Sequence, residues 1–326
     1  MSRFPFGRLL LLATAVLSCT TPTSPLAAKS ALAASGDAAP AEVAMVPARA
    51  TIHRQVIDDT ELRVLPRAAN GRDYLLYIGL PRSFKDHPER RYPVLYLCDG
   101  YWDFNLVNGL YGNLLYDGVV PEYILVGFGY PDQTTGDERD PKTRTTPDYE
   151  RLRRWDLSPV VDQNGRNPDE WGHASDFLTV VEREIIPFIE NNYRGDPSYR
   201  VLGGSSLGGL FVLYALFARP NLFAAYIAPS PVVSLGNDWL FKYEEAFAKG
   251  GGAPQLKARL FLTAAEKEAP SMVAAIKRFN ARLSKRAYPN LAYQFRTIDG
   301  ERHAGTKAES YNRGVRFAFL PRAPKP

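Results

Sequence analysis

The sequence predicts an α/β fold whose central sheet is mostly parallel and covered by helices on both faces. From about residue 51 onward, short β-rich runs alternate with longer segments of helical periodicity, which is typical of such a sheet. The 326 residues are 45% hydrophobic and 23% charged, as in an ordinary folded globular protein, which excludes collagen, coiled coil and wholesale disorder. The net charge of +5 is small and its basic residues are scattered, so no nucleic-acid partner is expected.

The N-terminal segment has the layout of a bacterial export signal. Arg3 and Arg8 precede an apolar run from Leu9 to Leu17, which is too short to span a bilayer as a helix. We expect residues 1–33 to be a signal peptide, with residues 26–28 as an alternative cleavage site. The sequence before Cys19 resembles a lipobox, although Leu17 fits it poorly, so lipoprotein processing with a lipid anchor at Cys19 is a second alternative.

The remaining chain divides into a linker and one domain. Residues 34–50 are rich in Ala and Pro and predict a flexible linker, and residues 51–326 form the folded domain. No later segment is apolar for about 18 residues, so we expect no transmembrane span and an exported, periplasmic or secreted protein. Cys98 ends an apolar run and is expected to be a buried structural thiol without a disulfide partner.

The expected strands are short runs of apolar, β-branched and aromatic residues. They are Tyr74 to Ile78, Val94 to Cys98, Tyr123 to Phe128, Arg200 to Gly203, Ala224 to Ala228, Arg259 to Thr263 and Ala292 to Thr297. An additional edge strand is expected around His53.

Four helices are expected from apolar periodicity. They run from Ser175 to Asn191, Leu207 to Ala218, Ser271 to Leu283 and Thr306 to Phe319. Pro187 lies inside the first and should kink it, because proline lacks an amide donor. Residues 131–170 show little periodicity and predict a lid or binding loop without regular structure, at the carboxyl edge of the sheet.

The strongest chemical signal is the motif Gly204-x-Ser206-x-Gly208, which matches a nucleophile elbow. The context fits, because a strand precedes the motif and an apolar helix follows it. Neighbouring positions in such a strained turn must lack side chains, and Gly203 and Gly209 extend that space. We expect the Ser206 hydroxyl to be a nucleophile at the sheet edge; a glycine-rich turn that only packs tightly is the alternative.

A serine hydroxyl needs an adjacent base at neutral pH. In a hydrolase-type fold the histidine follows the nucleophile, and of the four histidines only His303 does. It lies between the last expected strand and the last helix, where a loop can bring it over the elbow; a lone surface histidine is the alternative. His87 lies in a charged loop, whereas His173 either touches substrate or packs at a helix start.

A carboxylate should orient the imidazole and stabilise its cation. Two glutamates follow the strand that ends near Thr263. Glu268 is the first choice, because a small residue, here Ala265, commonly stands three positions before the acid. Glu266 is the alternative acid, and a surface charge cluster is the structural alternative for both.

An oxyanion formed at the elbow needs two backbone donors. We expect the Leu207 amide to be one and the turn at Gly100 and Tyr101 to supply the other. Other candidates for substrate contact are Trp102, Arg154, Trp155 and His173. Two alternatives remain open. The arginines at 151, 153 and 154 also fit a solvated charge run with Asp148 and Glu150. The aromatic residues Tyr101, Trp102, Phe104 and Trp155 fit either an acyl or aryl pocket or the core.

These segments together resemble the "putative esterase" family of α/β hydrolases, which includes siderophore esterases, S-formylglutathione hydrolase and mycolyltransferases. The likeness runs along most of the chain after residue 50 and looks closest to the enterochelin-esterase-like branch. It rests on an ordered set of motifs: Tyr92 to Gly100, Arg154 to Pro159, Glu184 to Ile189, Gly204 to Leu210 and Ala228 to Pro231. One departure is Ala265, which stands where the family often has glycine before the acid.

The resemblance implies Ser206 as nucleophile, His303 as base and Glu268 or Glu266 as acid, in an α/β-hydrolase fold. Some siderophore esterases of this type manage with a serine–histidine pair alone. The expected function is an exported serine esterase that cleaves a small-molecule carboxylic ester, such as a siderophore, through an acyl-enzyme, with no metal or organic cofactor. The alternatives are an acyltransferase of the mycolyltransferase type and a non-catalytic cell-envelope binding protein on the same fold.

Overall fold

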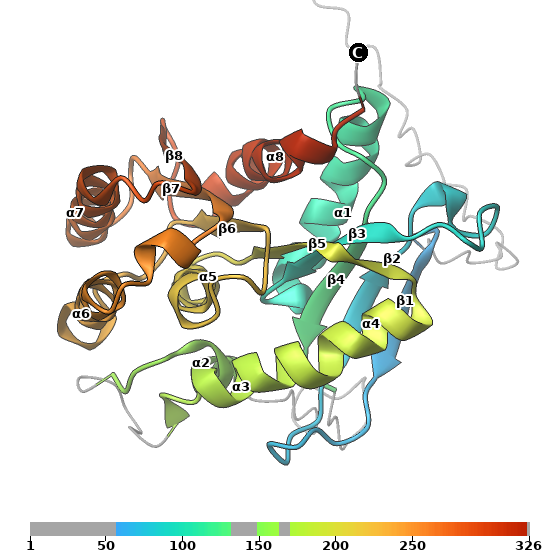
Figure 1. Cartoon of the computed structure of the whole chain (residues 1–326), viewed down its shortest axis with the longest axis horizontal. Helices are drawn as coiled ribbons and strands as arrows, with labels where there is room; N and C mark the ends of the chain where they lie inside the picture. Colours follow the sequence, from blue (N-terminus) through green and yellow to red (C-terminus); the bar gives the residue numbers. More distant parts are fainter. Residues whose placement is uncertain (1–56, 132–148, 163–169, 325–326) are drawn as a thin grey trace, which may run out of the picture. The chain divides into compact units, whose positions relative to one another are not determined.

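Eight strands form one sheet in the residues that the structure describes, which are 57–131, 149–162 and 170–324 of a computed structural model (Figure 1). The expected signal peptide, linker and His53 strand lie outside these residues. The strand order is β1-β2-β4-β3-β5-β6-β7-β8. The strands are β1 (Thr60–Val64), β2 (Leu75–Gly79), β3 (Tyr92–Leu97), β4 (Ile124–Gly129), β5 (Gly195–Gly203), β6 (Ala225–Pro229), β7 (Ala258–Ala265) and β8 (Leu291–Ile298).

The strands from β3 onward run parallel, whereas β1 and β2 pair in antiparallel fashion at one end of the sheet. Leu97 of β3 pairs with Gly203 of β5, which in turn pairs with Ile227 of β6. The loops that follow these strands therefore emerge at one edge of the sheet. This arrangement confirms the expected α/β class and the mostly parallel sheet.

Helices cover both faces of the sheet (Figure 1). The helices α1 (Gly100–Tyr116) and α8 (Thr306–Phe319) share a core with side chains from one face of the strands, such as Leu95 and Ile227. The opposite core contains side chains of alternate strand positions, such as Tyr96 and Tyr226. It is covered by α2 (Tyr149–Leu157), α3 (Ala174–Val180), α4 (Ile186–Asn192), α5 (Leu207–Ala218), α6 (Leu235–Lys249) and α7 (Pro270–Arg286).

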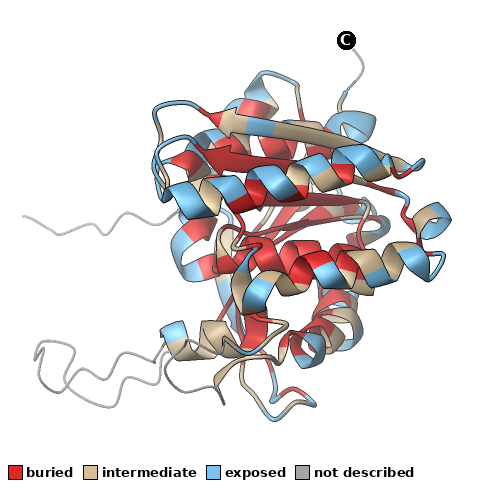
Figure 2. Cartoon of the chain, turned by 90° about the vertical axis from the view of Figure 1, so that its left-hand side faces the viewer, coloured by how far each residue is buried: buried red, intermediate tan, exposed pale blue. Residues whose placement is uncertain are grey.

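Figure 2 shows that most helices turn a buried face to the sheet and an exposed face outward. The exception is α5, whose residues from Leu207 to Phe217 are all buried, because this helix follows the elbow into the middle of the core. Cys98 is fully buried as expected, and burial raises the pKa of its thiol.

The expected strands overlap β2 to β8, and the four expected helices are present, with Thr306–Phe319 matching residue for residue. The strand β1 has no apolar alternation, since most of its residues are exposed at the end of the sheet. The helix α1 contains glycines at 100, 109 and 112, which weaken a helix signal. The helix α6 is interrupted at Gly236–Asp238, where three successive residues have positive φ. None of these three elements was expected.

Two predictions about local structure need correction. The stretch 131–170 is not free of regular structure, because α2 occupies Tyr149–Leu157; residues 132–148 and 163–169 lie outside the described part of the chain. The expected helix with Pro187 is divided by a π-helical turn, η3 (Val181–Ile185), and Pro187 is the second residue of α4. The wider turn accommodates a residue that cannot donate an amide bond.

Candidate active site

Ser206 stands in a strained backbone conformation between β5 and α5. Its φ of 61° and ψ of −116° lie in a region that L-residues rarely adopt. Two backbone bonds hold this turn against the segment after β6: the Ser206 amide donates to Pro229 O at 3.0 Å, and the Val232 amide donates to Ser206 O at 3.1 Å. The neighbouring strand therefore fixes the direction of the serine side chain.

Close packing explains why glycines flank Ser206. A Cβ at Gly204 would lie 2.8 Å from the carbonyl carbon and oxygen of Gly208. A Cβ at Gly209 would lie 2.9 Å from Cβ of Pro231. Because backbone atoms and a proline ring cannot move aside easily, both positions exclude a side chain. The glycines thus allow helix α5 to begin directly after Ser206.

The loop after β8 brings His303 to Glu268, which follows β7. The His303 Nδ1 atom and a Glu268 carboxylate oxygen are in hydrogen-bond contact. The Glu268 side chain is 3% exposed, whereas the His303 side chain is 43% exposed. The second carboxylate oxygen of Glu268 is buried without a hydrogen-bond partner in the described chain. A buried carboxylate on Nδ1 leaves Nε2 for proton transfer and stabilises the imidazolium.

Glu266 has a different environment from Glu268. Its carboxylate accepts a hydrogen bond of 2.6 Å from the Gly300 amide, which lies at the start of the loop that carries His303. The Glu266 amide donates to Ile298 O at the end of β8, at 3.0 Å. Glu266 therefore fixes the base of the loop, and Glu268 is the carboxylate that contacts the imidazole.

Successive strand ends are joined by hydrogen bonds at this edge of the sheet. The Ser230 amide, after β6, donates to Thr263 O of β7 at 3.1 Å. The Ala265 amide donates to the Ser230 hydroxyl, also at 3.1 Å. Together with the Ser206–Pro229 and Glu266–Ile298 bonds, these contacts form a continuous chain from the elbow to the loop that carries His303.

The two candidate oxyanion segments begin helices. Leu207 is the first residue of α5 and Gly100 the first of α1, so their amides belong to the unpaired N-terminal turns. A Cβ at Gly100 would lie 2.8 Å from the Gly127 carbonyl carbon, so α1 begins in tight contact with β4. The Tyr101 amide faces the hydroxyl of Tyr149; burial raises the pKa of this hydroxyl, and the amide acts to lower it.

Two ion pairs that the sequence did not reveal surround the start of α1. Asp99 accepts two hydrogen bonds from the Arg153 guanidinium, at 2.6 and 3.0 Å, which joins α1 to α2. Asp103, one turn later, accepts from Lys307 Nζ at 2.7 Å, which joins α1 to α8 four residues after His303. Burial raises the pKa of Asp103, and Lys307 acts to lower it.

The sequence indicated no role for Asp99 or Asp103, because helix α1 was not expected. Once α1 is known, Asp99 is the left-handed residue that precedes the helix, and Asp103 lies in its first turn. Trp102 lies between them in sequence, with the Arg153 guanidinium 5.3 Å and the Lys307 Nζ 6.0 Å from its ring centroid. Tyr101 and Trp102 are 60% and 44% exposed, so both present aromatic surface beside the candidate oxyanion turn.

The remaining candidate substrate residues are engaged within the protein. Arg154 pairs with Glu170 at 2.9 Å, and Arg153 is 12% exposed, so the solvated charge run is wrong for both. Trp155 stacks on His173 with ring centroids 3.8 Å apart, and His173 directly precedes α3, so it packs at the helix start. Of the aromatic residues weighed as pocket or core, Phe104 belongs to the core.

A mostly parallel sheet with a strained serine turn after β5 and a histidine–glutamate pair after β7 and β8 defines an α/β hydrolase. A family model described as "Putative esterase" matches residues 68–260. The chain belongs to this esterase family.

Similar proteins agree with this membership. The chain is 26% identical over 289 residues to the ferri-bacillibactin esterase BesA of Bacillus subtilis, covering 82% of this chain and 92% of that protein. The crystal structure of the BES protein from Bacillus cereus is 27% identical with a TM-score of 0.69, over 82% of this chain and 98% of that one. The siderophore hydrolase EstB from Aspergillus nidulans, 23% identical with a TM-score of 0.65 over 84% and 100% of the chains, shares the fold.

Proposed function

We propose that this chain is a serine esterase in which Ser206, His303 and Glu268 form the catalytic triad. The observation that carries the proposal is the pairing of two features at one edge of the sheet: a serine at a strained strand-to-helix turn and a histidine whose Nδ1 contacts a buried carboxylate. Similar proteins are named as esterases, which supports the same reaction class.

In the proposed mechanism, His303 Nε2 removes the Ser206 proton while the serine oxygen attacks the ester carbonyl. The Leu207 amide and an amide of the Gly100–Tyr101 turn donate to the oxyanion of the tetrahedral intermediate. The C–O bond to the alcohol then breaks, and the imidazolium protonates the leaving alcohol. Water, deprotonated by His303, attacks the acyl-enzyme and releases the carboxylic acid and free Ser206.

We propose a siderophore-type ester as the substrate class. A catecholate acyl group has an aromatic ring, and Tyr101 and Trp102 offer exposed aromatic surface beside the candidate oxyanion turn. The similar protein BesA, whose name specifies a ferri-bacillibactin esterase, matches this chain over most of both lengths and supports this choice.

Labelling with a fluorophosphonate probe tests the nucleophile, and the chain offers a matched control. Ser205 adjoins Ser206, is 1% exposed and has a buried hydroxyl without a hydrogen-bond partner in the described residues. We expect the wild type and Ser205→Ala to be labelled and Ser206→Ala to remain unlabelled. Equal labelling of wild type and Ser206→Ala would show that the nucleophile lies elsewhere.

A substrate panel tests the substrate class. Linear and cyclic catecholate siderophores, feruloyl sugars and short p-nitrophenyl esters are compared by kcat/KM, with and without an added alcohol acceptor. We expect the siderophore esters to have the highest kcat/KM and the free acid to be the main product. A preference for feruloyl sugars would contradict the substrate class, and acceptor-dependent ester formation would indicate an acyltransferase.

We also propose that the protein is exported, which the apolar run after Arg3 and Arg8 supports. No helix in the described part of the chain is long and apolar enough to cross a membrane. Mass spectrometry of the mature N-terminus tests export, with cleavage near residue 33 as the expected result. Lipid labelling that is lost in Cys19→Ser would instead indicate anchoring at Cys19.

A further inference from the structure

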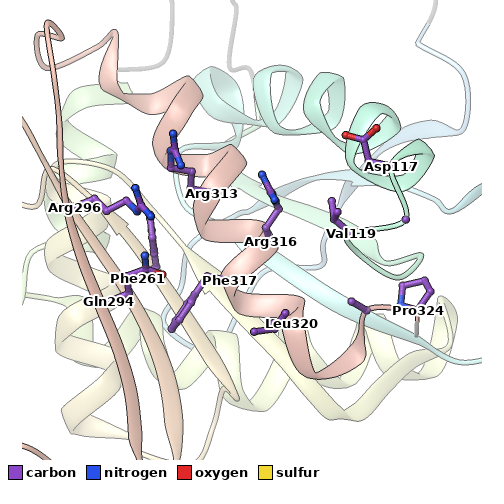
Figure 3. Close-up of a pocket in the computed structure, with 12 residues that line it drawn as sticks. Asp117, Val119, Phe261, Gln294, Arg296, Arg313, Arg316, Phe317, Leu320 and Pro324 are labelled. Carbon is purple, nitrogen blue, oxygen red and sulfur yellow. The ribbon is translucent and has the colours of Figure 1, made fainter. Parts of the chain in front are cut away.

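A pocket of about 650 Å³ lies beside α8 and includes no residue of the candidate active site (Figure 3). Its lining comes from α8, β8, the middle of β7, the turn after α1 and the C-terminal residues that follow α8. The turn after α1 lies at the opposite end of that helix from Gly100 and Tyr101. The volume of the pocket falls within the usual range of small-molecule sites.

The α8 part of the lining forms one continuous stripe. Arg313, Arg316, Phe317 and Leu320 follow the spacing i, i+3, i+4 and i+7, so they project from one face of the helix and the turn that continues it. Figure 3 shows Phe317 between α8 and the neighbouring strands. This face therefore combines cationic and apolar side chains.

The facing wall comes from the strands β7 and β8. Gln294 of β8 pairs in register with Phe261 of β7, and Arg296 lies two residues further along β8 on the same side of the sheet. Phe261 is 1% exposed and forms an apolar floor. The third guanidinium of the pocket thus comes from a different element than the two on α8.

The charges of the pocket are unbalanced. Arg296 and Arg316 are exposed, and neither pairs with a carboxylate within residues 57–131, 149–162 and 170–324. Arg313 pairs with Glu309 at 2.6 Å, but both side chains are more than 40% exposed, so this pair is weak. Asp117 is the one acidic residue among the lining residues, against three arginines. The pocket therefore favours an anion.

Its apolar surface adds a second requirement. Leu320 is 62% exposed, and Phe317 is partly exposed beside it. Removing such apolar surface from water is favourable. A bare inorganic anion would leave this surface in water. A molecule with a carboxylate at one end and an apolar body would use both the guanidinium groups and the apolar stripe.

We propose that this pocket binds a small amphipathic carboxylate, with its head group among the guanidinium groups of Arg296, Arg313 and Arg316 and its apolar body against Phe317 and Leu320. Guanidinium groups match a carboxylate through paired hydrogen bonds. The concave shape and the buried floor at Phe261 fit a single small molecule rather than the flat surface of a membrane.

Calorimetric titration with sodium decanoate tests this proposal on the full-length Ser206→Ala protein, so that catalysis plays no part. We expect decanoate to bind, and the double variant Arg296→Gln/Arg316→Gln to weaken the affinity at least about tenfold, since two charge-assisted contacts are lost. The matched control is Arg183→Gln, which replaces an exposed arginine of η3 without an ion pair in the described chain and should leave the affinity unchanged. Neutral 1-decanol should bind at least about tenfold more weakly than decanoate.

A second variant tests the apolar half of the site. Leu320→Asp changes an exposed position, where folding is tolerant, and adds a charge that repels the ligand. We expect it to abolish decanoate binding, with thermal unfolding as the folding control.

Several outcomes would overturn the proposal: no decanoate binding, unchanged affinity in the double arginine variant, or an equal loss in Arg183→Gln. Arginine-dependent binding to phosphatidylglycerol vesicles without decanoate binding would show that this surface contacts membranes instead. Because the readout is binding to an inactive variant, its failure leaves the proposed esterase activity untouched.

Discussion

The turn that holds Ser206 follows strand β5, and the loop that carries His303 follows strand β8 of the same sheet. The two segments are held in place in different ways. The Ser206 turn is held by backbone contacts: glycines packed against backbone atoms and a proline, and amide bonds to the segment after β6. The His303 loop depends more on side chains: besides the backbone bond from the Lys267 amide to Glu301 O at 2.8 Å, it is held by the Glu268 carboxylate, the Glu266 contact with Gly300 and the Lys307–Asp103 pair.

This difference affects both rigidity and tolerance to substitution. A backbone turn without room for a side chain tolerates almost no change, whereas a loop held by ion pairs depends on particular charged groups. The exposure of the two regions agrees with this contrast, because Ser205 and the glycines beside Ser206 are buried and the His303 side chain is 43% exposed.

Replacing the carboxylate on His303 should give the largest effect. Glu268→Gln removes the charge that orients the ring and stabilises the imidazolium, so kcat should fall roughly 1,000- to 10,000-fold. The matched control is Glu266→Gln, whose amide oxygen still accepts the Gly300 amide, and kcat should change by less than about threefold. Steady-state kinetics measures both; a larger loss in Glu266→Gln would reverse the assignment of the acid.

A methyl group at Gly204 should disrupt the Ser206 turn itself. Its Cβ would lie 2.8 Å from the Gly208 backbone and 2.9 Å from Cβ of Cys98. We expect Gly204→Ala to lower kcat at least about 100-fold by displacing the serine, and to lower the free energy of unfolding by about 2 kcal/mol.

The control for that substitution is Gly109→Ala. Gly109 lies within α1 and has open space where the methyl group would stand. Alanine there should stabilise the protein by roughly 0.5–1 kcal/mol without changing kcat, because alanine favours a helix. Equal losses of stability in both variants, measured by urea unfolding, would contradict the packing explanation.

Breaking the ion pair behind the His303 loop should have an intermediate effect. Lys307→Met leaves the buried Asp103 carboxylate without its cation, and we expect a loss of about 3 kcal/mol in unfolding free energy. The effect on kcat should be roughly tenfold, since His303 is displaced rather than removed. Lys307→Arg should recover most of both, whereas Lys285→Met, at an exposed position of α7, should change neither. Full activity in Lys307→Met would show that the loop does not depend on this pair.

The smallest expected effect concerns Asp156, a carboxylate buried away from both regions. Burial raises its pKa from 3.8 to about 6, and Arg72 acts to lower it. Because the folded state binds this proton more tightly than the unfolded state, stability from this group increases as the pH falls through about 6 towards 4. Between pH 7 and pH 5 the wild type should gain about 1 kcal/mol relative to Asp156→Asn in urea unfolding. An identical pH dependence in both proteins would contradict the raised pKa.

Most of the sheet could be predicted from the sequence because its parallel strands are continuous apolar runs. The same holds for the helix from Thr306 to Phe319, whose apolar face is regular. Four elements escaped prediction for local reasons: β1 is exposed, α1 contains several glycines, five of the nine residues of α2 are charged, and α6 is broken by residues at positive φ. The π-helical turn before Pro187 also has no distinct sequence signal.

The sequence by itself located the Ser206 turn, because the signal consists of residues adjacent in the chain: a strand, glycines and an apolar helix. Only the tertiary structure decided between Glu268 and Glu266 as the partner of His303. Although the two glutamates are only two residues apart after β7, Glu268 contacts the imidazole and Glu266 contacts the Gly300 amide. It also revealed the pairs Asp99–Arg153 and Asp103–Lys307. The members of these two pairs are 54 and 204 positions apart in the sequence, respectively. Such distant pairs leave no local sequence pattern, because only the fold brings their members together.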